Sequence, residues 1–182
     1  DRLKPEQAWT IREAAMEDGG IGYLPVGSGK TLVGILIALA LRNCRLAVLL
    51  IKPDQRVHYR LAYARLREHF RVPTIVWDDG WAGSVLVPGT PAVHVVPYSL
   101  LQNKRSTVHL EKLSPDVVIA DEAHCLANKA SARSGRVLRY IAGRRGQTRF
   151  CGWSGTLEWK SIADVAHLSA FALGMRSPLP ID

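Results

Sequence analysis

"YLPVGSGKT", residues 23–31, decides the fold of this chain. A short apolar stretch leads into a turn with two glycines, and lysine, threonine and an apolar run at 31–41 follow directly. A strand, a tight turn and a helix in this order leave backbone N–H groups and the positive end of the helix facing one hollow. The stretch therefore predicts a phosphate-binding loop inside an α/β fold.

The residue types at the end of the loop suit a nucleotide. Gly27 and Gly29 let the backbone approach phosphate oxygens, Lys30 supplies a charge for the β and γ phosphates, and Thr31 offers magnesium a hydroxyl. The expected ATP-binding residues are Pro25, Val26, Gly27, Ser28, Gly29, Lys30 and Thr31. Leu24 stands where the usual pattern begins with glycine, away from the phosphate-contacting end. The alternative interpretation is a chance Gly-Lys-Thr turn.

Composition limits the class of protein. The 182 residues suit about one domain, and 47% hydrophobic with 22% charged residues is typical of a globular protein. The net charge of +8 favours a polyanionic partner, nucleic acid first and an anionic membrane second. A basic protein without such a partner is the alternative.

Other features indicate an intracellular protein, cytoplasmic or nuclear. Cys44, Cys125 and Cys151 are far apart without metal-ligand spacing, which predicts reduced thiols. The chain starts with Asp1, which indicates a trimmed fragment without a signal peptide. The apolar run at 31–41 is too short to cross a bilayer, so we expect a buried helix and no membrane partner.

Apolar strands alternate with helical patterns along the chain. This alternation predicts a mostly parallel central sheet with helices on both faces, and ligands at the carboxyl ends of the strands. The helix at 54–70 is expected to begin at a cap by Asp54, with apolar positions at Val57, Leu61, Ala64 and Phe70. The Gly/Pro-rich stretch 78–91 is expected to be a surface hairpin or loop. Strands are expected at 19–25, 45–53, 72–77, 92–98, 116–124 and 148–156, and the other helices at 4–18, 29–42, 130–142 and 161–173.

Two acids follow the buried strand "VVIA". Asp121 is placed to hold magnesium, and Glu122 could polarise the water that attacks a phosphate. Together with Lys30 they are the expected catalytic residues, and Thr31 and Asp121 the metal ligands. Asp121 as an ordinary helix N-cap is the alternative.

Four motifs resemble those of one family. "LPVGSGKT" (24–31) is similar to motif I, "DEAH" (121–124) to motif II and "SGT" (154–156) to motif III of superfamily 2 helicases and translocases, and "LKPEQ" (3–7) resembles their L-x-P-x-Q element. The resemblance runs from Leu3 to about Gly174 and implies the first RecA-like domain over residues 1–182, with ATP and Mg²⁺ as ligands. It implies that Gln7 reads adenine. It also implies that His124, Ser154, Gly155 and Thr156 couple ATP to nucleic acid.

The stretches after motifs II and III are similar to the Snf-type DNA translocases. "DEAHCLANKASARSGRVL" (121–138) and "SGTLEWKSIADVAHLSAFALG" (154–174) carry that resemblance. Leu157 stands where that group has proline, and the loop that begins at Leu24 is nearer to the repair helicases.

The same resemblance suggests where nucleic acid lies. Residues 49–56 and 95–101 resemble motifs Ia and Ib, and Lys52, Arg56, Tyr98 and Ser99 are the expected contacts to DNA, with RNA not excluded. Core packing is the alternative for Tyr98. A second basic feature comprises Lys129, Arg133, Arg136 and Arg139, spaced along one face of the expected helix as a phosphate track, a docking surface or simply a solvated face.

These observations favour the ATP-binding lobe of an ATP-dependent DNA helicase or double-stranded DNA translocase. The family's second RecA-like lobe and its arginine finger have no counterpart after residue 156, so we expect the fragment to bind ATP but hydrolyse it poorly. A solitary lobe that binds nucleic acid or assembles with partners without catalysis is the alternative. A different P-loop enzyme is less favoured because no L-S-G-G-Q signature or nucleotide-kinase lid is apparent.

Overall fold

The computed structural model describes residues 2–77, 87–102, 108–144, 146–155 and 163–179. Within these ranges six parallel strands form one sheet, which confirms the predicted α/β architecture. Most of the stretch predicted as a surface hairpin or loop, and also Thr156, lie outside the described residues. Across the sheet the strands are β1 (Gly20–Tyr23), β6 (Arg149–Ser154), β5 (Val117–Asp121), β2 (Leu46–Ile51), β4 (Ala92–Pro97) and β3 (Thr74–Trp77).

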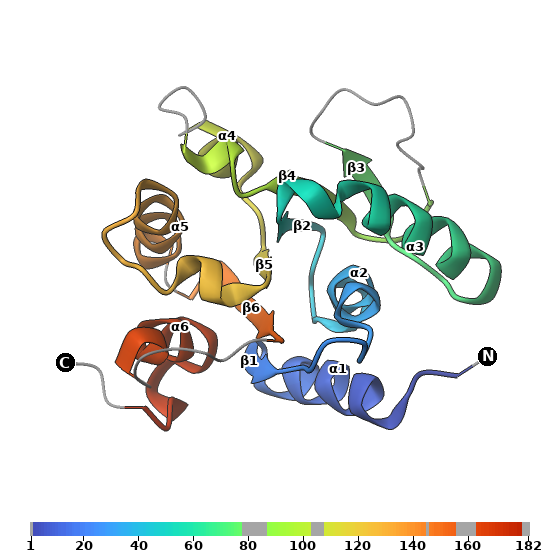
Figure 1. Ribbon diagram of the computed structural model, residues 1–182, viewed down its shortest axis with the longest axis horizontal. Coiled ribbons are helices and arrows are strands. Elements are labelled where there is room, and N and C mark those ends of the chain that lie inside the picture. The colour runs from blue at the N-terminus through green and yellow to red at the C-terminus, as the bar shows by residue number, and fades with distance from the viewer. Residues whose placement is uncertain (1, 78–86, 103–107, 145, 156–162, 180–182) are drawn as a thin grey trace.

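Helices cover both faces of the sheet (Figure 1). The central strands are apolar throughout because each face needs its own core: Leu49 and Ile119 pack on one side, Leu50 and Val118 on the other. The first core includes residues of α1 (Pro5–Glu17), α2 (Lys30–Ala40) and α3 (Arg56–His69). The second includes residues of α4 (Val108–Leu113), α5 (Ala132–Gly143) and α6 (Ala163–Leu173). The sequence did not predict α4, which is only six residues long.

The apolar run after the loop is the buried helix that the sequence predicted. In α2 six consecutive residues from Val33 to Ala38 are buried. A helix that is hydrophobic all round requires neighbours on every side, and α2 lies between the sheet and helices α1 and α3 (Figure 1). Among the described residues, no helix combines the length and apolar character needed to span a membrane. Cys44, Cys125 and Cys151 are free thiols, as expected.

The expectations for α3 need two corrections. Asp54 does not cap the helix, because a 3₁₀ turn at Pro53–Gln55 comes first and Gln55 takes the N-cap position without a side-chain hydrogen bond. The expected apolar face is also wrong at three positions, since Val57, Leu61 and Ala64 are exposed and Phe70 is half-buried.

The buried face of α3 carries two tyrosines instead. Tyr59, Tyr63 and Leu66, spaced by four and three residues, face the core. Their hydroxyl groups find partners in the interior: Tyr59 donates to Asp121 Oδ2 and Tyr63 to the carbonyl oxygen of Pro73, each at 2.8 Å. These bonds offset the cost of burying a phenol, so the face with the tyrosines is buried and the face with the aliphatic residues is exposed.

Two leucines test this assignment of faces. Leu49→Ala, in the centre of the sheet, should lower the free energy of unfolding by about 2–5 kcal/mol because it leaves a cavity. Leu61→Ala, at a side chain 56% exposed, should change it by less than about 0.5 kcal/mol. Urea unfolding of both variants measures the difference, and comparable losses would contradict the observed orientation of α3.

Candidate nucleotide site

Glycine conformation shapes the phosphate-binding loop. Gly27 and Gly29 have φ of 83° and 84°, in the left-handed region that other residues avoid, and Gly29 caps α2. A Cβ on Gly29 would also collide with the side-chain amide of Gln7. The loop thus requires glycine at position 29 for two independent reasons.

Leu24 fits at the position where the usual motif has glycine. Among the described residues other than glycine, positive φ occurs only at Asp18, Asn43, Ser114 and Glu122, so position 24 does not require glycine. The Leu24 side chain is buried, its N–H donates to the carbonyl oxygen of Ser154 at 3.1 Å, and its own carbonyl accepts from Lys30 Nζ at 3.3 Å. The departure from the pattern therefore leaves the loop intact.

Gln7 braces the loop from α1. Its side chain is 5% exposed; Nε2 donates to the carbonyl oxygen of Ser28 at 2.7 Å, and Oε1 accepts from the N–H of Lys4 at 2.9 Å. These bonds fix the amide beside the loop. Contact of Gln7 with adenine stays a prediction.

An ion pair joins the loop to the acids after β5. Lys30 Nζ lies 3.2 Å from Glu122 Oε1, and each side chain is 12% exposed. Glu122 itself has φ 55° and ψ 56°, a left-handed conformation that costs a non-glycine residue about 1–2 kcal/mol. Ser154 and Gly155 hold the other carboxylate oxygen of this strained residue. Glu122 Oε2 accepts from the hydroxyl of Ser154 at 3.2 Å and from the N–H of Gly155 at 3.3 Å.

Burial and charge act in opposite directions on Glu122. Burial raises the pKa of its carboxyl, but the Lys30 ammonium beside it, the N–H of Gly155 and His124 outweigh burial, so the net pKa is below the ordinary value. Glu122 is therefore an anion at neutral pH, and its charge balances that of the Lys30 ammonium.

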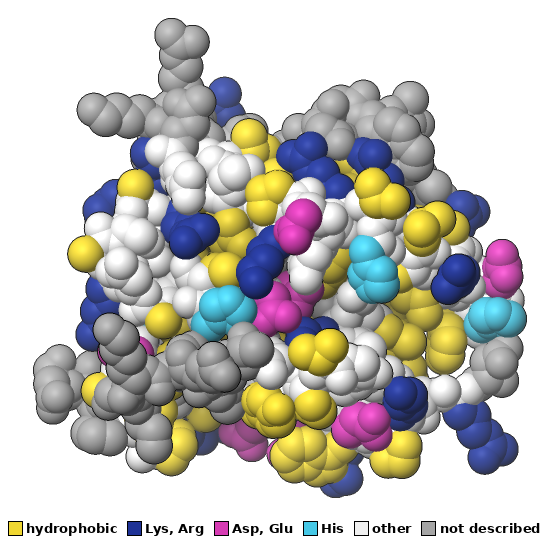
Figure 2. Space-filling model, viewed as in Figure 1, with side chains coloured by type: hydrophobic (Ala, Val, Ile, Leu, Met, Phe, Trp, Pro, Cys, Tyr) yellow, Lys and Arg dark blue, Asp and Glu magenta, His cyan; other side chains and the backbone are white. Residues whose placement is uncertain are grey.

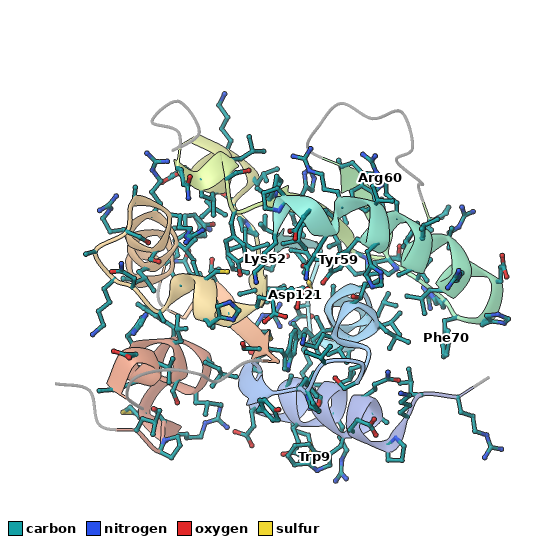
Figure 3. All side chains as sticks on the ribbon, in the orientation of Figure 1. Trp9, Lys52, Tyr59, Arg60, Phe70 and Asp121 are labelled. Carbon is teal, nitrogen blue, oxygen red and sulfur yellow. The ribbon has the colours of Figure 1, made fainter. Side chains whose placement is uncertain are left out.

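Asp121 is held by two donors. Its side chain is buried; Oδ1 accepts from the N–H of Glu122 at 3.0 Å and Oδ2 from the hydroxyl of Tyr59 at 2.8 Å. Figure 3 shows Tyr59 and Asp121 close together in the middle of the molecule. Asp121 is thus not the helix N-cap of the alternative interpretation, because Glu122 takes the cap position of the following turn, Ala123–Leu126. Burial raises the pKa of Asp121, and the Tyr59 hydrogen bond opposes that rise.

The residues present fit a magnesium ion bound together with a nucleotide. Burial raises the pKa of the Tyr59 phenol and the nearby Thr31 hydroxyl acts against that rise, so the carboxylate of Asp121 and the hydroxyl of Thr31 both lie near one phenol. Hard oxygen ligands of this kind suit Mg²⁺, which usually takes one or two protein carboxylates and completes its shell with phosphates and water. Within the part of the chain that the structure describes, no cluster of three or more His, Cys, Asp or Glu could hold a metal alone. The nucleotide would therefore supply part of the coordination.

His124 connects the acids to β6. Its Nδ1 lies 2.8 Å from Ser154 Oγ and 3.2 Å from Glu122 Oε2. Burial and the nearby Lys52 ammonium lower the pKa of His124, which favours the neutral imidazole. A carboxylate only accepts hydrogen bonds, so the Ser154 hydroxyl donates to Glu122. His124 Nδ1–H then donates to Ser154 Oγ and Glu122 Oε2. Three of the four predicted coupling residues, His124, Ser154 and Gly155, therefore touch Glu122.

A pocket of about 510 Å³ opens beside His124. Lys52, Ser99 and Tyr98, three of the four residues predicted to contact nucleic acid, line it, whereas Arg56 does not. Figure 2 shows acidic, basic and histidine side chains meeting near the centre of this face. The remaining residues that line the pocket are Pro53, Asp54, Gln102, His124, Cys125 and Arg133.

The Tyr98 side chain is packed in the interior. Tyr98 is 1% exposed, and its hydroxyl donates to the backbone carbonyl of Asp121 at 2.8 Å. The phenol thus braces the end of β5, and contact of Tyr98 with nucleic acid stays a prediction. Packing, the alternative interpretation, is the observed role.

The predicted basic helix face is also divided. Lys129 precedes α5, which begins at Ala132 after the N-cap Ser131. Arg136 donates to the backbone carbonyl of Leu101, and Arg133 lines the pocket. Arg139 is exposed. Sequence spacing placed these cations on one face, but tertiary contacts give each a different environment.

Comparison with known proteins places the chain in a family. A family model described as "Type III restriction enzyme, res subunit" matches residues 3–174. The chain belongs to this family. No curated protein matches the sequence.

Solved structures agree with the fold. The Sulfolobus solfataricus SWI2/SNF2 ATPase core in complex with dsDNA is similar over 94% of this chain, with a TM-score of 0.65 and 14% identity. A nuclease-deletion mutant of the Type ISP restriction-modification enzyme LlaGI, in complex with a DNA substrate mimic, is similar over 86%, with a TM-score of 0.58 and 15% identity. The chain covers 36% and 18% of those chains. It is a RecA-like lobe of the superfamily 2 type, as the sequence predicted.

The sequence did not predict two features of the site. Tyr59, the donor to Asp121, is 62 residues away from it, and a tyrosine in a helix carries no signal of that partner. Arg133 lines the same pocket as Lys52, and α5, which carries it, packs beside the 3₁₀ turn Leu100–Gln102. Both follow from packing between distant segments.

The charge of Glu122 should be visible in stability against pH. Because its pKa is lowered in the folded protein, the carboxylate stabilises the fold above the ordinary value of 4.5, and this stabilisation is lost as the pH falls through the lower folded pKa. Glu122→Gln should therefore be less stable than the parent at pH 7, and the difference should shrink on acidification below 4.5. Urea unfolding from pH 7 to pH 3.5 measures it; a difference independent of pH would show that the charge is not the cause.

Proposed function

We propose that this chain is the ATP-binding and ATP-hydrolysing lobe of a DNA helicase or double-stranded DNA translocase. The 3.2 Å pair between Lys30 and Glu122 carries the proposal, because it joins the phosphate-binding loop to the acids after β5. A lobe that only binds nucleic acid would not need a strained, charged glutamate beside the loop. The assembled acids therefore favour hydrolysis over the non-enzymatic alternative.

The resting ion pair suggests how ATP prepares the site. The γ-phosphate brings oxygens that bind Lys30 more strongly than one carboxylate does, so Lys30 exchanges Glu122 for phosphate. Glu122, still held by Ser154 and Gly155, is then free to orient a water for in-line attack. Its lowered pKa keeps it ionised for this role.

Asp121 and Thr31 would hold Mg²⁺ on the same side of the loop. When bound, the ion neutralises charge on the β and γ phosphate oxygens. Backbone N–H groups of the loop would cradle the phosphates, at a turn whose shape the two left-handed glycines set. Gln7 would meet the adenine from α1, where it already braces Ser28.

Hydrolysis at full rate would require a second RecA-like lobe of the same protein. The family's arginine finger resides there by resemblance, and this chain spans a minor part of the similar solved chains. The lobe alone should bind ATP and turn it over slowly. The stretches after motifs II and III support a place near the Snf-type translocases.

DNA would lie across the pocket beside His124. Lys52 and Arg133 bring two cations to it, Ser99 adds an exposed hydroxyl and Asp54 one opposing acid. The charges of Lys52 and Arg133 both lower the pKa of His124, so a phosphate held between them would be sensed at the residue that touches Glu122. This proximity offers a route from DNA to the catalytic carboxylate.

The nucleotide assignment is tested with two substitutions. Lys30→Ala should weaken Mg·ATP binding at least tenfold, because the phosphates lose a charge-assisted hydrogen bond worth about 1.5–3 kcal/mol. Glu122→Gln should retain binding in the protein with both lobes but lose most turnover, since an amide is a poor base. Calorimetry and a phosphate-release assay measure the two effects. Unchanged ATP affinity in Lys30→Ala, or parental turnover in Glu122→Gln, would contradict the assignment.

The DNA assignment is tested with two arginines of α5. Arg133→Gln should reduce the slope of log K against log salt by about 0.9, the counterion release of one phosphate contact. Arg139→Gln, six residues further on the same helix and outside the pocket, should leave the slope unchanged. Fluorescence anisotropy with a random-sequence duplex measures both. Equal effects of the two variants would mean that the pocket is not the phosphate site.

A further inference from the structure

Tyr59 lies beside the two side chains that would hold magnesium. Its hydroxyl donates to Asp121 Oδ2 at 2.8 Å, and burial raises its pKa while the nearby Thr31 hydroxyl acts against that rise. Asp121 and Thr31 come from different elements, β5 and α2, and Tyr59 comes from a third, α3. One phenol thus fixes the Asp121 carboxylate at a point close to the second oxygen ligand, Thr31.

The surroundings hold the phenol rigidly. Tyr59 is 1% exposed, in the core between α3, α2 and the sheet (Figure 3). On α2, one turn after Thr31, residue 34 is glycine, and a Cβ there would already lie 3.4 Å from the Tyr59 hydroxyl. The hydroxyl therefore fits against the helix backbone, where α2 leaves room for it.

Two other buried tyrosines show that this arrangement differs from ordinary packing. Tyr63, one turn later on α3, donates to the backbone carbonyl of Pro73, and Tyr98 donates to the backbone carbonyl of Asp121. Both hydroxyls satisfy main-chain groups at 2.8 Å. Tyr59 instead bonds to a carboxylate oxygen that the proposed chemistry requires.

We propose that Tyr59 is a positioning residue for the magnesium site, fixing the orientation of the Asp121 carboxylate before the ion and nucleotide arrive. The inference rests on the proposed nucleotide function and extends it to a residue outside the motifs. Each oxygen of the carboxylate has two lone pairs, and the bonds from Glu122 and Tyr59 occupy one on each. One acceptor position per oxygen remains for the ion or its water. Partners of this kind commonly change metal affinity about 10–100-fold when they are removed.

The test compares Tyr59→Phe with Tyr63→Phe. Each removes one buried hydroxyl and one 2.8 Å bond from the same helix, so their costs in stability should be similar, about 1 kcal/mol each. Binding of the non-hydrolysable analogue AMP-PNP is measured by calorimetry in EDTA and at stepped Mg²⁺ concentrations. Tyr59→Phe should need about tenfold more Mg²⁺ for half of the magnesium-dependent gain in affinity. Tyr63→Phe should match the parent, and all three proteins should bind equally in EDTA.

Each outcome has a distinct meaning. Equal Mg²⁺ requirements in Tyr59→Phe and Tyr63→Phe would overturn the positioning role. So would a loss of binding by Tyr59→Phe in EDTA, because the hydroxyl would then support the whole loop rather than the metal ligands. A parent that does not bind AMP-PNP under any condition would instead refute the proposed function itself.

Discussion

The parallel register of three neighbouring strands is the constraint on which the site depends. Tyr23 at the end of β1 aligns with Ser154 at the end of β6, and Trp153 aligns with Asp121 at the end of β5. Segments that are far apart in the chain therefore end side by side at one edge of the sheet. The phosphate-binding loop, the acids and the Ser-Gly pair each begin where a strand stops, so the hydrogen-bonded ladder sets their spacing.

Electrostatics then divides the work between two adjacent acids. Asp121 points into the interior, where burial raises its pKa and two neutral donors hold it. Glu122 faces Lys30, and its pKa is lowered despite partial burial. The left-handed backbone at Glu122 sends consecutive side chains to these different environments. One residue is thus suited to a cation, and the other to a competing phosphate and a water.

The same edge places the proposed DNA pocket beside the proposed hydrolytic residues. His124 touches Glu122 on one side and lines the pocket with Lys52 and Arg133 on the other. The His124 side chain would therefore lie between the proposed DNA and the water that Glu122 is proposed to orient. Coupling across it requires only a small change in charge or position at His124.

The sequence by itself determined the sheet, the buried helix α2 and the composition of the loop. Each depends on a local pattern of residues: apolar strands, an apolar helix, and glycines before Lys30. It also located Asp121 and Glu122 at the end of a strand. Tertiary structure alone decided which face of α3 is buried, since two phenols with interior partners are better core residues than their positions in a helical pattern suggest. It likewise decided that Tyr98 packs, that Arg136 bonds to a backbone carbonyl, and that Tyr59 meets Asp121. These facts depend on which polar group finds which partner across the core, and a single sequence does not record such long-range pairings.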